Sequence, residues 1–501
     1  EIDDYIMTER RLYAENQAEF YAELQQDYAK IKGLQAVRDN KTLFLSKYAP
    51  MIRAELSSSE IKTLAQDPRV QGIYYSPEVK VEEEGNISVP LIRANYTRDT
   101  LGYTGSGIKI GLLEAYGFPD TTLDYFAETN IIYESDIGNV IDAHANMVAA
   151  IMIASESTVN GVTYKGIVPD ATLYATYING TDWRARAEWL LSQGVHVINM
   201  SAGIRSNGVE GAYDGNAMWL DHIALNHSVH FVKSAGNNGN KVTSPGLAYN
   251  AITVGAIDDN NTATHSDDER YDRSSYKEAS GEQIIPTNKP DLVAPGVEIL
   301  SAAANFENTA VNTGTSLSAP HVTAVIAQLC QARPALKVAQ DVVKAILTAS
   351  VSHSSIAYET SDTDAYDKYG AGVVDAYSSY YTAINGRYVS GSFGANSGNG
   401  AEKSYTFNVS SSDSKIRVSL SWLKYIVLAG THTTANANNH PLADLDLLVY
   451  APNGTLVEYA VSVYNNTEIV EFEPANTGTY RIVVRQTRQS ERAVYFGLAW
   501  W

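Results

Sequence analysis

The stretch Gly314-Thr315-Ser316-Leu317-Ser318-Ala319-Pro320-His321 is followed by an apolar run over residues 322–329. This pattern predicts a serine in the first turn of a buried helix. Gly314 tolerates backbone angles that other residues avoid, and Pro320 suits a first turn, whose N–H groups have no intrahelical partner. Those N–H groups and the helix dipole would stabilise negative charge beside Ser316. An isolated Gly-Thr-Ser is more often a plain helix cap, so the interpretation of Ser316 depends on the rest of the chain.

Length and composition indicate a globular protein of about two or three domains, because the chain has 501 residues. Acidic residues outnumber basic ones by 57 to 37, which disfavours nucleic acid and anionic membranes as partners and suits an extracellular protein. The sequence contains no run of about 18 apolar residues, so no membrane-spanning helix is expected. The single cysteine, Cys330, excludes an intrachain disulfide and is expected to be buried. The opening Glu-Ile-Asp-Asp lacks the pattern of a signal peptide, which we expect to be absent or removed.

Residues 1–85 read as a small α+β domain. Apolar residues recur at helical spacing over 4–32, and strands are predicted over 42–45, 51–56 and 70–75. Residues 58–65 have the pattern of a short helix with a serine cap. From these residues alone, such a unit could equally be a docking module.

The central part of the chain alternates buried strands with helices. Strands are predicted over 108–113, 195–200 and 229–234, and helices over 147–154 and 185–192. This alternation predicts an α/β fold of three layers, in which helices cover both faces of a parallel sheet. Reacting groups of such sheets gather at the carboxyl ends of the strands.

Small and polar residues follow each of these predicted strands. The first strand runs into Glu114-Ala115-Tyr116-Gly117, the second into Ser201-Ala202-Gly203, and the third ends in Ser234-Ala235-Gly236-Asn237. A predicted helix opens near His144. Because a neutral histidine is the side chain best suited to remove a hydroxyl proton near neutral pH, His144 is the candidate general base. The alternative is that His144 is merely a solvated side chain.

These segments together resemble the subtilisin-like serine protease family. The order acid, histidine, serine along the chain is that of the family, and further resembling passages lie at 105–109, 166–171, 289–297 and 369–376. The resemblance implies a subtilisin-like catalytic domain that hydrolyses peptide bonds through an acyl-enzyme.

The resemblance also implies the role of each site residue. Ser316 would be the nucleophile, His144 the base and Glu114 the acid that orients it. Asn237 and the Ser316 N–H would form the oxyanion hole, although Asn residues are also common in turns. The segments that match the family's substrate-pairing strands are Ser201, Ala202 and Gly203, and Ser234, Ala235 and Gly236. They would bind an extended polypeptide by strand addition, and the alternative is that they are ordinary turns.

Glu114 departs from the aspartate of the family. The extra methylene moves the carboxylate oxygens by about 1.5 Å, so either the backbone retreats or the pairing with the histidine is imperfect. Asp120, Asp124 and Asp142 are alternatives for the acid, although each also suits a loop or a helix cap. The segment 145–147 also differs from the family's Gly-Thr-His. These departures leave open a second function, that of a catalytically weak or inactive pseudoprotease that binds or regulates.

The flanking parts carry resemblances of their own. Residues 54–81 resemble the inhibitory propeptide of the family, which implies a zymogen whose leading segment acts as an intramolecular inhibitor, with cleavage near 81–86. After residue 386, strands are predicted over 403–409, 415–422, 446–450, 479–484 and 494–499, which is typical of a β-sandwich. This part resembles the jelly-roll-like domains that follow some secreted members. Asp444 and Asp446 could hold calcium, but the spacing also suits a solvated strand face, which we prefer.

The sequence therefore predicts three domains: a propeptide-like inhibitory domain over 1–85, a catalytic domain over 86–385 and an all-β sandwich over 386–501. The expected function is that of a secreted serine endopeptidase made as a zymogen. Its expected partners are a polypeptide substrate and its own leading segment, with neither nucleic acid nor membrane. No cofactor is expected for the chemistry, no metal site is assigned, and a structural calcium is possible but not placed.

Overall fold

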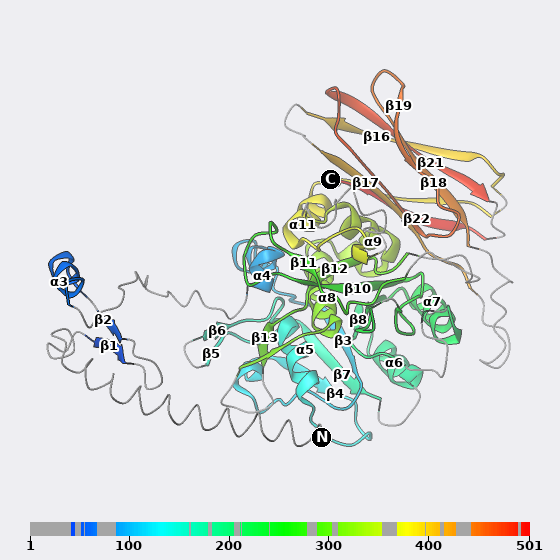
Figure 1. Ribbon diagram of the computed structural model, residues 1–501. Helices are drawn as coiled ribbons and strands as arrows, with labels where there is room; N and C mark the ends of the chain where they lie inside the picture. Colours follow the sequence, from blue (N-terminus) through cyan, green and yellow to red (C-terminus); the bar gives the residue numbers. More distant parts are fainter. Residues whose placement is uncertain are drawn as a thin grey trace, which may run out of the picture. The chain divides into compact units, whose positions relative to one another are not determined.

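The computed structural model describes residues 42–45, 52–54 and 56–67, and residues 87–501 apart from 160–161, 179–182, 205–210, 212, 240, 278–287, 303–308, 353–367, 396, 411–414, 427–441 and 489–491. The chain forms two compact units, Glu1–Glu82 and Glu83–Trp501, which are described separately (Figure 1). Among these residues, no helix combines the length and the apolar character needed to cross a membrane.

The first unit contains a short hairpin and a capped helix. Strand β1 (Thr42–Leu45) pairs antiparallel with β2 (Ile52–Ala54), and helix α3 spans Ser58–Leu64. The Ser57 hydroxyl accepts from the Glu60 N–H while the Glu60 carboxylate accepts from the Ser57 N–H, which makes a capping box. The strands and the helix lie where the sequence predicts them. The predicted helix over 4–32 and the predicted strand over 70–75 lie outside the described residues.

The second unit is built on an eight-stranded sheet (Figure 1). Its seven parallel strands are β3 (Lys109–Glu114), β4 (Asn130–Tyr133), β7 (Thr172–Tyr177), β8 (Val197–Met200), β9 (His230–Ser234), β10 (Ala251–Asp258) and β12 (Leu292–Pro295). They lie in the order β4-β7-β3-β8-β9-β10, with β12 beside β10, and the short β11 (Glu269–Arg270) joins β10 antiparallel. The predicted parallel α/β fold is confirmed.

Helices cover both faces of this sheet. Helices α5 (Ala143–Ile153) and α8 (Thr315–Ala332) belong to one apolar core, and α6 (Trp183–Ser192) and α7 (Gly215–His227) to the other. Strand β3 contributes to both, since Leu112 packs into the core with α5 and α8, and Leu113 into the core with α6 and α7. By this alternation, the next residue, Glu114, points to the same side as Leu112, where α5 begins.

Shorter elements complete this part of the unit. They are helix α4 (Ser88–Leu91), the π-helical turn Tyr96–Thr100, the 3₁₀ turns Asp124–Phe126 and Pro334–Val338, the hairpins β5 (Ser157–Val159) with β6 (Val162–Tyr164) and β13 (Ile299–Ala302) with β14 (Thr309–Asn312), and helices α9 (Gln340–Ala349) and α11 (Ala376–Ile384). Cys330 is buried in α8, and burial raises the pKa of its thiol to about 12.

A β-sandwich of two four-stranded antiparallel sheets ends the unit. One sheet has the order β15 (Tyr388–Phe393), β22 (Val494–Trp500), β17 (Ile416–Trp422) and β20 (Thr467–Phe472). The other has the order β16 (Ala401–Val409), β21 (Gly478–Arg488), β18 (Asp444–Tyr450) and β19 (Leu456–Ala460). The sequence predicted five of these strands and missed β15, β19 and β20, of which β15 and β19 have no fully alternating apolar pattern.

The interpretation of Asp444 and Asp446 as a solvated strand face is wrong. Their exposed fractions are 6% and 7%. Both residues lie on β18, which has β19 on one side and β21 on the other. Burial raises the pKa of Asp446 to about 6, and the Asp444 carboxylate adds to this rise. Among the described part of the chain, however, no three acidic, histidine or cysteine side chains gather as a metal site.

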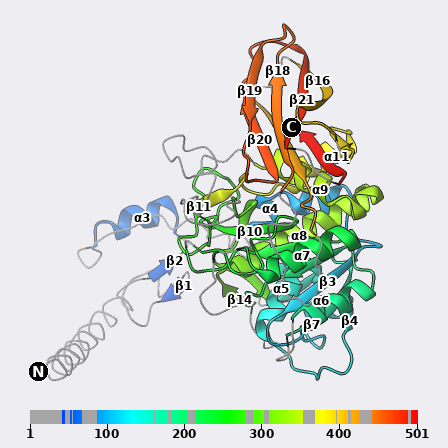
Figure 2. The same ribbon diagram turned by 90° about the vertical axis from the view of Figure 1, so that its right-hand side faces the viewer.

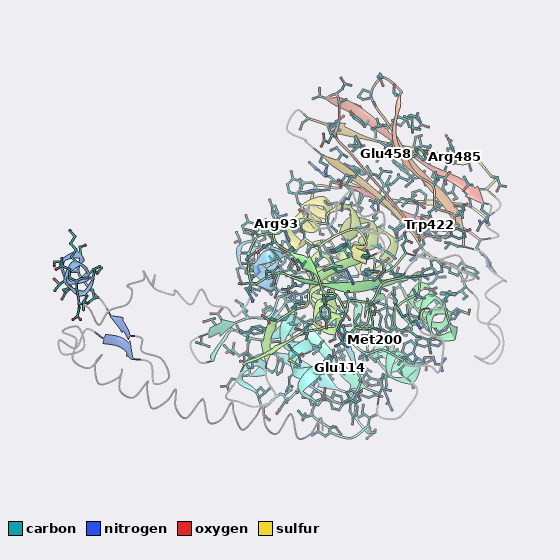
Figure 3. The ribbon with its side chains drawn as sticks, viewed as in Figure 1. Arg93, Glu114, Met200, Trp422, Glu458 and Arg485 are labelled. Atoms are coloured by element: carbon teal, nitrogen blue, oxygen red, sulfur yellow. The ribbon has the colours of Figure 1, made fainter. Side chains whose placement is uncertain are left out.

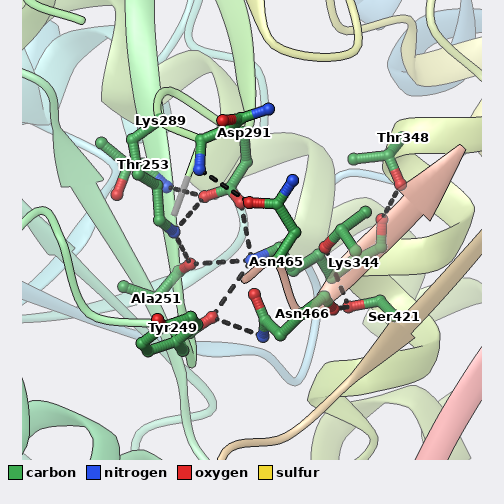
Figure 4. Close-up of polar contacts among 12 residues, drawn as sticks. Tyr249, Ala251, Thr253, Lys289, Asp291, Lys344, Thr348, Ser421, Asn465 and Asn466 are labelled. Atoms are coloured by element: carbon green, nitrogen blue, oxygen red, sulfur yellow. Dashed lines mark hydrogen bonds and ion pairs between the residues drawn. The ribbon is translucent and has the colours of Figure 1, made fainter. Parts of the chain in front are cut away.

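The sandwich is joined to the sheet through buried polar contacts. Helix α9 lies between the central sheet and the sandwich in both views (Figures 1 and 2). On α9, Lys344 donates to the Tyr249 carbonyl, which also accepts from Asn466 of the sandwich. The Asp291 carboxylate pairs with Lys289 on one oxygen and with Lys344 on the other, each at 2.6 Å (Figure 4). These contacts make the sandwich an integral part of the second unit.

Candidate active site

The carboxyl ends of three neighbouring strands bring the predicted site segments together. Strand β3 ends at Glu114, β8 ends at Met200 immediately before Ser201, and β9 ends at Ser234. Because β3, β8 and β9 are adjacent and parallel, these three ends lie at one edge of the sheet. Figure 3 labels Glu114 and Met200 at the ends of β3 and β8.

Glu114 contacts His144 directly. The Glu114 Oε2 atom lies 2.8 Å from Nδ1 of His144. The Glu114 side chain is 1% exposed and the His144 side chain 32% exposed. A buried carboxylate thus holds one ring nitrogen, which fixes the tautomer with Nδ1 protonated and leaves Nε2 free to accept a proton. The other carboxylate oxygen, Oε1, has no hydrogen-bond partner among the described residues.

The surroundings of His144 favour its protonated form. Desolvation by burial lowers the pKa of His144, but the carboxylates of Glu114 and Asp142 raise it more, so the pKa lies above its usual 6.5. The neighbouring carboxylates therefore stabilise the imidazolium that would form when the ring takes up a proton.

The three aspartates considered as alternatives for the acid have other structural roles. Asp142 is the N-cap of α5, and its Oδ1 accepts from the backbone N–H groups of His144 and Ala145. Asp120 accepts from Thr122 within its own turn, and Asp124 begins a 3₁₀ turn. The cap explains why α5 begins at Ala143, so that His144 lies in its first turn, as the sequence predicts.

Ser316 lies in the first turn of α8, as the sequence predicts, but the expected role of Pro320 is wrong. Helix α8 begins at Thr315, so Pro320 lies in its second turn. A residue at this position would normally donate its N–H to the carbonyl of Ser316. Proline has no N–H, and the Ser316 carbonyl accepts instead from the Ser201 hydroxyl at 2.7 Å. The Ser201 hydroxyl in turn accepts from Asn199, so a buried chain of bonds fixes the turn that carries Ser316.

Asn237 lies beside this helix start. Its Oδ1 accepts from the Thr315 N–H at 3.0 Å and from the Thr315 hydroxyl at 3.1 Å, so its Nδ2 is the end left to donate. A Cβ atom on Gly314 would lie 3.2 Å from Asn237 Nδ2 and 3.3 Å from Ser316 Oγ. Any larger residue at 314 would therefore crowd both groups, and the glycine lets the amide and the hydroxyl approach one another.

Not every predicted contact is present. Among the described residues, no hydrogen bond joins the Ser316 hydroxyl to the His144 ring. In ligand-free enzymes such bonds are often long and shorten only when substrate binds. The structure therefore brings Glu114 to His144 and Asn237 to the Ser316 turn, and it places both groups at the same edge of the sheet.

The two predicted substrate segments also lie at this edge. Ala235 already uses both backbone groups within the fold, because its N–H donates to the Val254 carbonyl and its carbonyl accepts from the Thr243 N–H. Ala202 is buried and Gly203 is exposed. Thr243 separates the two segments, and neither this residue nor the buried Lys233 on β9 was predicted to belong to the site. No local pattern marks either residue, because their position depends on how distant strands pair.

The comparisons with known proteins agree with this architecture. The model of the Subtilase family matches residues 80–381, and that of the bacterial pre-peptidase C-terminal domain matches residues 401–486. The chain belongs to the subtilase family, which is the class of serine endopeptidases that the fold and the motifs define. The sandwich is its pre-peptidase C-terminal domain.

Individual relatives are distant. The chain is 27% identical over 296 residues to M-protease of Shouchella clausii (strain KSM-K16), which covers 57% of this chain and 70% of the relative. It is 27% identical over 329 residues to subtilisin amylosacchariticus of Bacillus subtilis subsp. amylosacchariticus, a match that covers 61% of this chain and 77% of the relative. Among solved structures, the prenylagaramide maturation protease PagA matches with 22% identity and a TM-score of 0.45, over 57% of this chain and 98% of that one.

Proposed function

We propose that this protein is a secreted serine endopeptidase, made as a zymogen, that hydrolyses peptide bonds through a Ser-His-Glu triad. In this proposal Ser316 is the nucleophile, His144 the general base and Glu114 the acid. Asn237 and the Ser316 N–H form the oxyanion hole. An extended polypeptide substrate binds along Ser201-Ala202-Gly203 and Ser234-Ala235-Gly236.

The observation that carries the proposal is the 2.8 Å contact between the buried Glu114 carboxylate and His144 Nδ1. This is the contact through which a triad acid orients its histidine. The longer side chain is not an obstacle, because a glutamate at the end of β3 reaches the ring at normal hydrogen-bond distance. Ser-His-Glu arrangements also occur on other folds.

The chemistry follows from these positions. The Ser316 oxygen attacks the substrate carbonyl while its proton passes to Nε2 of His144. Asn237 Nδ2 and the Ser316 N–H donate to the carbonyl oxygen as it becomes negative. The imidazolium, stabilised by Glu114, then protonates the leaving amine, and the acyl-enzyme forms. Water, deprotonated by His144, hydrolyses this ester and restores the Ser316 hydroxyl. No cofactor takes part in these steps.

Activation and location form the second part of the proposal. The resemblance of residues 54–81 to an inhibitory propeptide supports a zymogen, with the leading unit as an intramolecular inhibitor. The net charge of −20 supports secretion, and it argues against nucleic acid and anionic membranes as partners. If the wild-type protein purifies as two associated fragments and Ser316→Ala purifies intact, the autoprocessing step is supported. Identical patterns for the two proteins would refute it.

The second candidate function is a catalytically silent binding protein. The observation that favours it is the absence, among the described residues, of a bond between Ser316 and His144. Reaction with a fluorophosphonate, followed by mass spectrometry of the labelled peptide, separates the two functions. Labelling at Ser316 in the wild type, lost in His144→Ala, supports the endopeptidase. An unlabelled Ser316 in a folded wild-type protein supports the silent function.

A further inference from the structure

Lys233 is a buried titratable group that the proposed chemistry does not use. It lies on β9, directly before Ser234-Ala235-Gly236, and its exposed fraction is 0%. Its ammonium donates to the Ser234 carbonyl, to the Ser234 hydroxyl at 3.1 Å and to the Thr243 hydroxyl at 3.3 Å. Burial lowers the pKa of Lys233 to about 7.

Lys289 and Lys344 are buried lysines that a carboxylate neutralises, and Lys233 is not neutralised in this way. Lys289 and Lys344 each lie 2.6 Å from an oxygen of Asp291 (Figure 4). Within the part of the chain that the structure describes, no carboxylate forms an ion pair with Lys233. Burial of an ammonium costs free energy unless an anion compensates it, and neutral hydroxyl and carbonyl oxygens compensate only in part. A substrate carboxylate would supply the missing charge.

The ammonium lies behind a contact between the two predicted substrate segments. A Cβ atom on Gly236 would lie 2.6 Å from Thr243 Cγ2, and one on Gly203 would lie 3.1 Å from Thr243 Oγ1. The Thr243 side chain therefore packs against the backbone of both segments. Because its hydroxyl also contacts the ammonium, Lys233 lies one side chain away from a substrate held between those segments.

The position of Asn237 identifies which substrate residue faces Thr243. If Asn237 donates to the carbonyl oxygen under attack, then the residue that owns this carbonyl lies beside Gly236, the neighbour of Asn237 in the chain. In such a complex, the side chain of that residue would lie near Gly203, Gly236 and Thr243, which lie together. Among the described residues, Lys233 is the charged side chain that hydrogen-bonds to the Thr243 hydroxyl.

We propose that Lys233 makes this enzyme prefer an acidic side chain, aspartate or glutamate, at the residue whose carbonyl is attacked. The preference rests on the proposed function, because it assumes that Ser316 and Asn237 act on a bound polypeptide. A carboxylate over Thr243 gains attraction to the ammonium in a region poor in water, whereas the corresponding amide, of the same size and shape, does not. A basic side chain at this position is repelled.

Paired peptides that differ only in charge test the proposal. We expect kcat/KM for peptides with aspartate or glutamate at this position to exceed that for asparagine or glutamine by about tenfold or more. In Lys233→Met the ratio falls to about one. The matched control is Lys109→Met, which removes a cation from the first residue of β3, at the opposite end of that strand, and leaves the ratio unchanged.

The outcomes separate this inference from the proposed function. Turnover of the amide peptides that disappears in Ser316→Ala supports the endopeptidase, whatever the charge preference. With such turnover, a wild-type acid-to-amide ratio of one or below overturns the role of Lys233, even if Lys233→Met does not fold. If no peptide is turned over, the same ratio is measured as dissociation constants on Ser316→Ala. Tighter binding of the acidic peptides then supports the inference, and equal binding overturns it.

Discussion

Asp291 and Glu114 are both buried carboxylates, but their surroundings differ. Asp291 binds Lys344 with one oxygen and Lys289 with the other, and the second oxygen also accepts from the Thr253 N–H. Glu114 binds His144 with one oxygen, and its other oxygen has no partner among the described residues. Because each oxygen of Asp291 already pairs with a buried lysine, its role is structural: it holds α9 against the sheet. Glu114 has a single partner, partly exposed and able to change its protonation state, which is the arrangement that proton transfer requires.

The largest expected effect is a loss of kcat on mutation of the proposed triad. Ser316→Ala and His144→Ala are each expected to lower kcat by about 10⁶, because either change removes the nucleophile or its base. The free energy of unfolding of Ser316→Ala should stay close to that of the wild type. Peptide hydrolysis under single-turnover conditions and chemical denaturation measure the two quantities. A variant that retains more than about one hundredth of the activity would show that a different group carries the reaction.

Mutation of Asp291 should instead lower the stability of the fold. Asp291→Asn is expected to cost about 3–5 kcal/mol of unfolding free energy, because it leaves two buried ammonium groups without their anion. Denaturation measures this loss, and kcat of the protein that remains folded should change little. Ser316→Ala, which should lose activity and keep its stability, gives the contrast. A loss below about 1 kcal/mol would show that the Asp291 pairs do not hold α9 to the sheet.

Asn237→Ala tests the oxyanion hole. Loss of this donor is expected to lower kcat by about 10² to 10³ with little change in KM, because the bond strengthens only as the carbonyl oxygen becomes negative. Steady-state kinetics measure both constants. Asn238→Ala is the matched control in the same turn. An equal effect of the two changes would indicate that the turn, and not the Asn237 amide, is what matters.

The smallest expected effect is a displacement of the pH profile. Because the carboxylates of Glu114 and Asp142 raise the pKa of His144 above 6.5, the ring is protonated, and inactive as a base, up to a higher pH than usual. The acid limb of kcat/KM should therefore lie above about pH 6.5. In Asp142→Asn, which keeps the cap but removes one charge, the limb should move to lower pH. A limb that does not move would mean that Asp142 does not act on His144.

The same raised pKa has a consequence for stability with a definite sign. The charged pair of His144 and Glu114 contributes stability that is fully present below the unfolded-state pKa, about 6.5. This contribution is lost as the pH rises through the higher folded-state pKa. Removal of the Glu114 charge should therefore destabilise the protein at mildly acidic pH more than at alkaline pH.

Much of this fold could be predicted from local pattern, and the parts that could not depend on contacts between distant segments. Buried strands that alternate with helices were enough to place Glu114, Ser201 and Asn237 at one edge of a sheet. The resemblance implied that Glu114 orients His144, but the 2.8 Å distance could not be read from the sequence, because it depends on how the end of β3 and the start of α5 pack together. Pro320 was assigned to the wrong turn because the start of α8 was not known.

The sandwich shows the same limit. Asp444 and Asp446 are buried in the folded protein, whereas their spacing in the sequence suggested a solvated strand face. Lys233 was read simply as part of a strand. Its position behind Thr243 appears only when β9 and the segment around residue 243 pack together.

The measurement that tests the triad most directly is kcat of Glu114→Gln against that of Asp142→Asn. Both changes remove one carboxylate near His144, but only the first removes the carboxylate that binds Nδ1. We expect Glu114→Gln to lower kcat by about 10⁴, because the ring loses its orientation and tautomer, and Asp142→Asn to lower it by less than about tenfold. A Glu114→Gln enzyme with wild-type kcat, or equal losses in the two variants, would contradict the assignment of Glu114 as the triad acid.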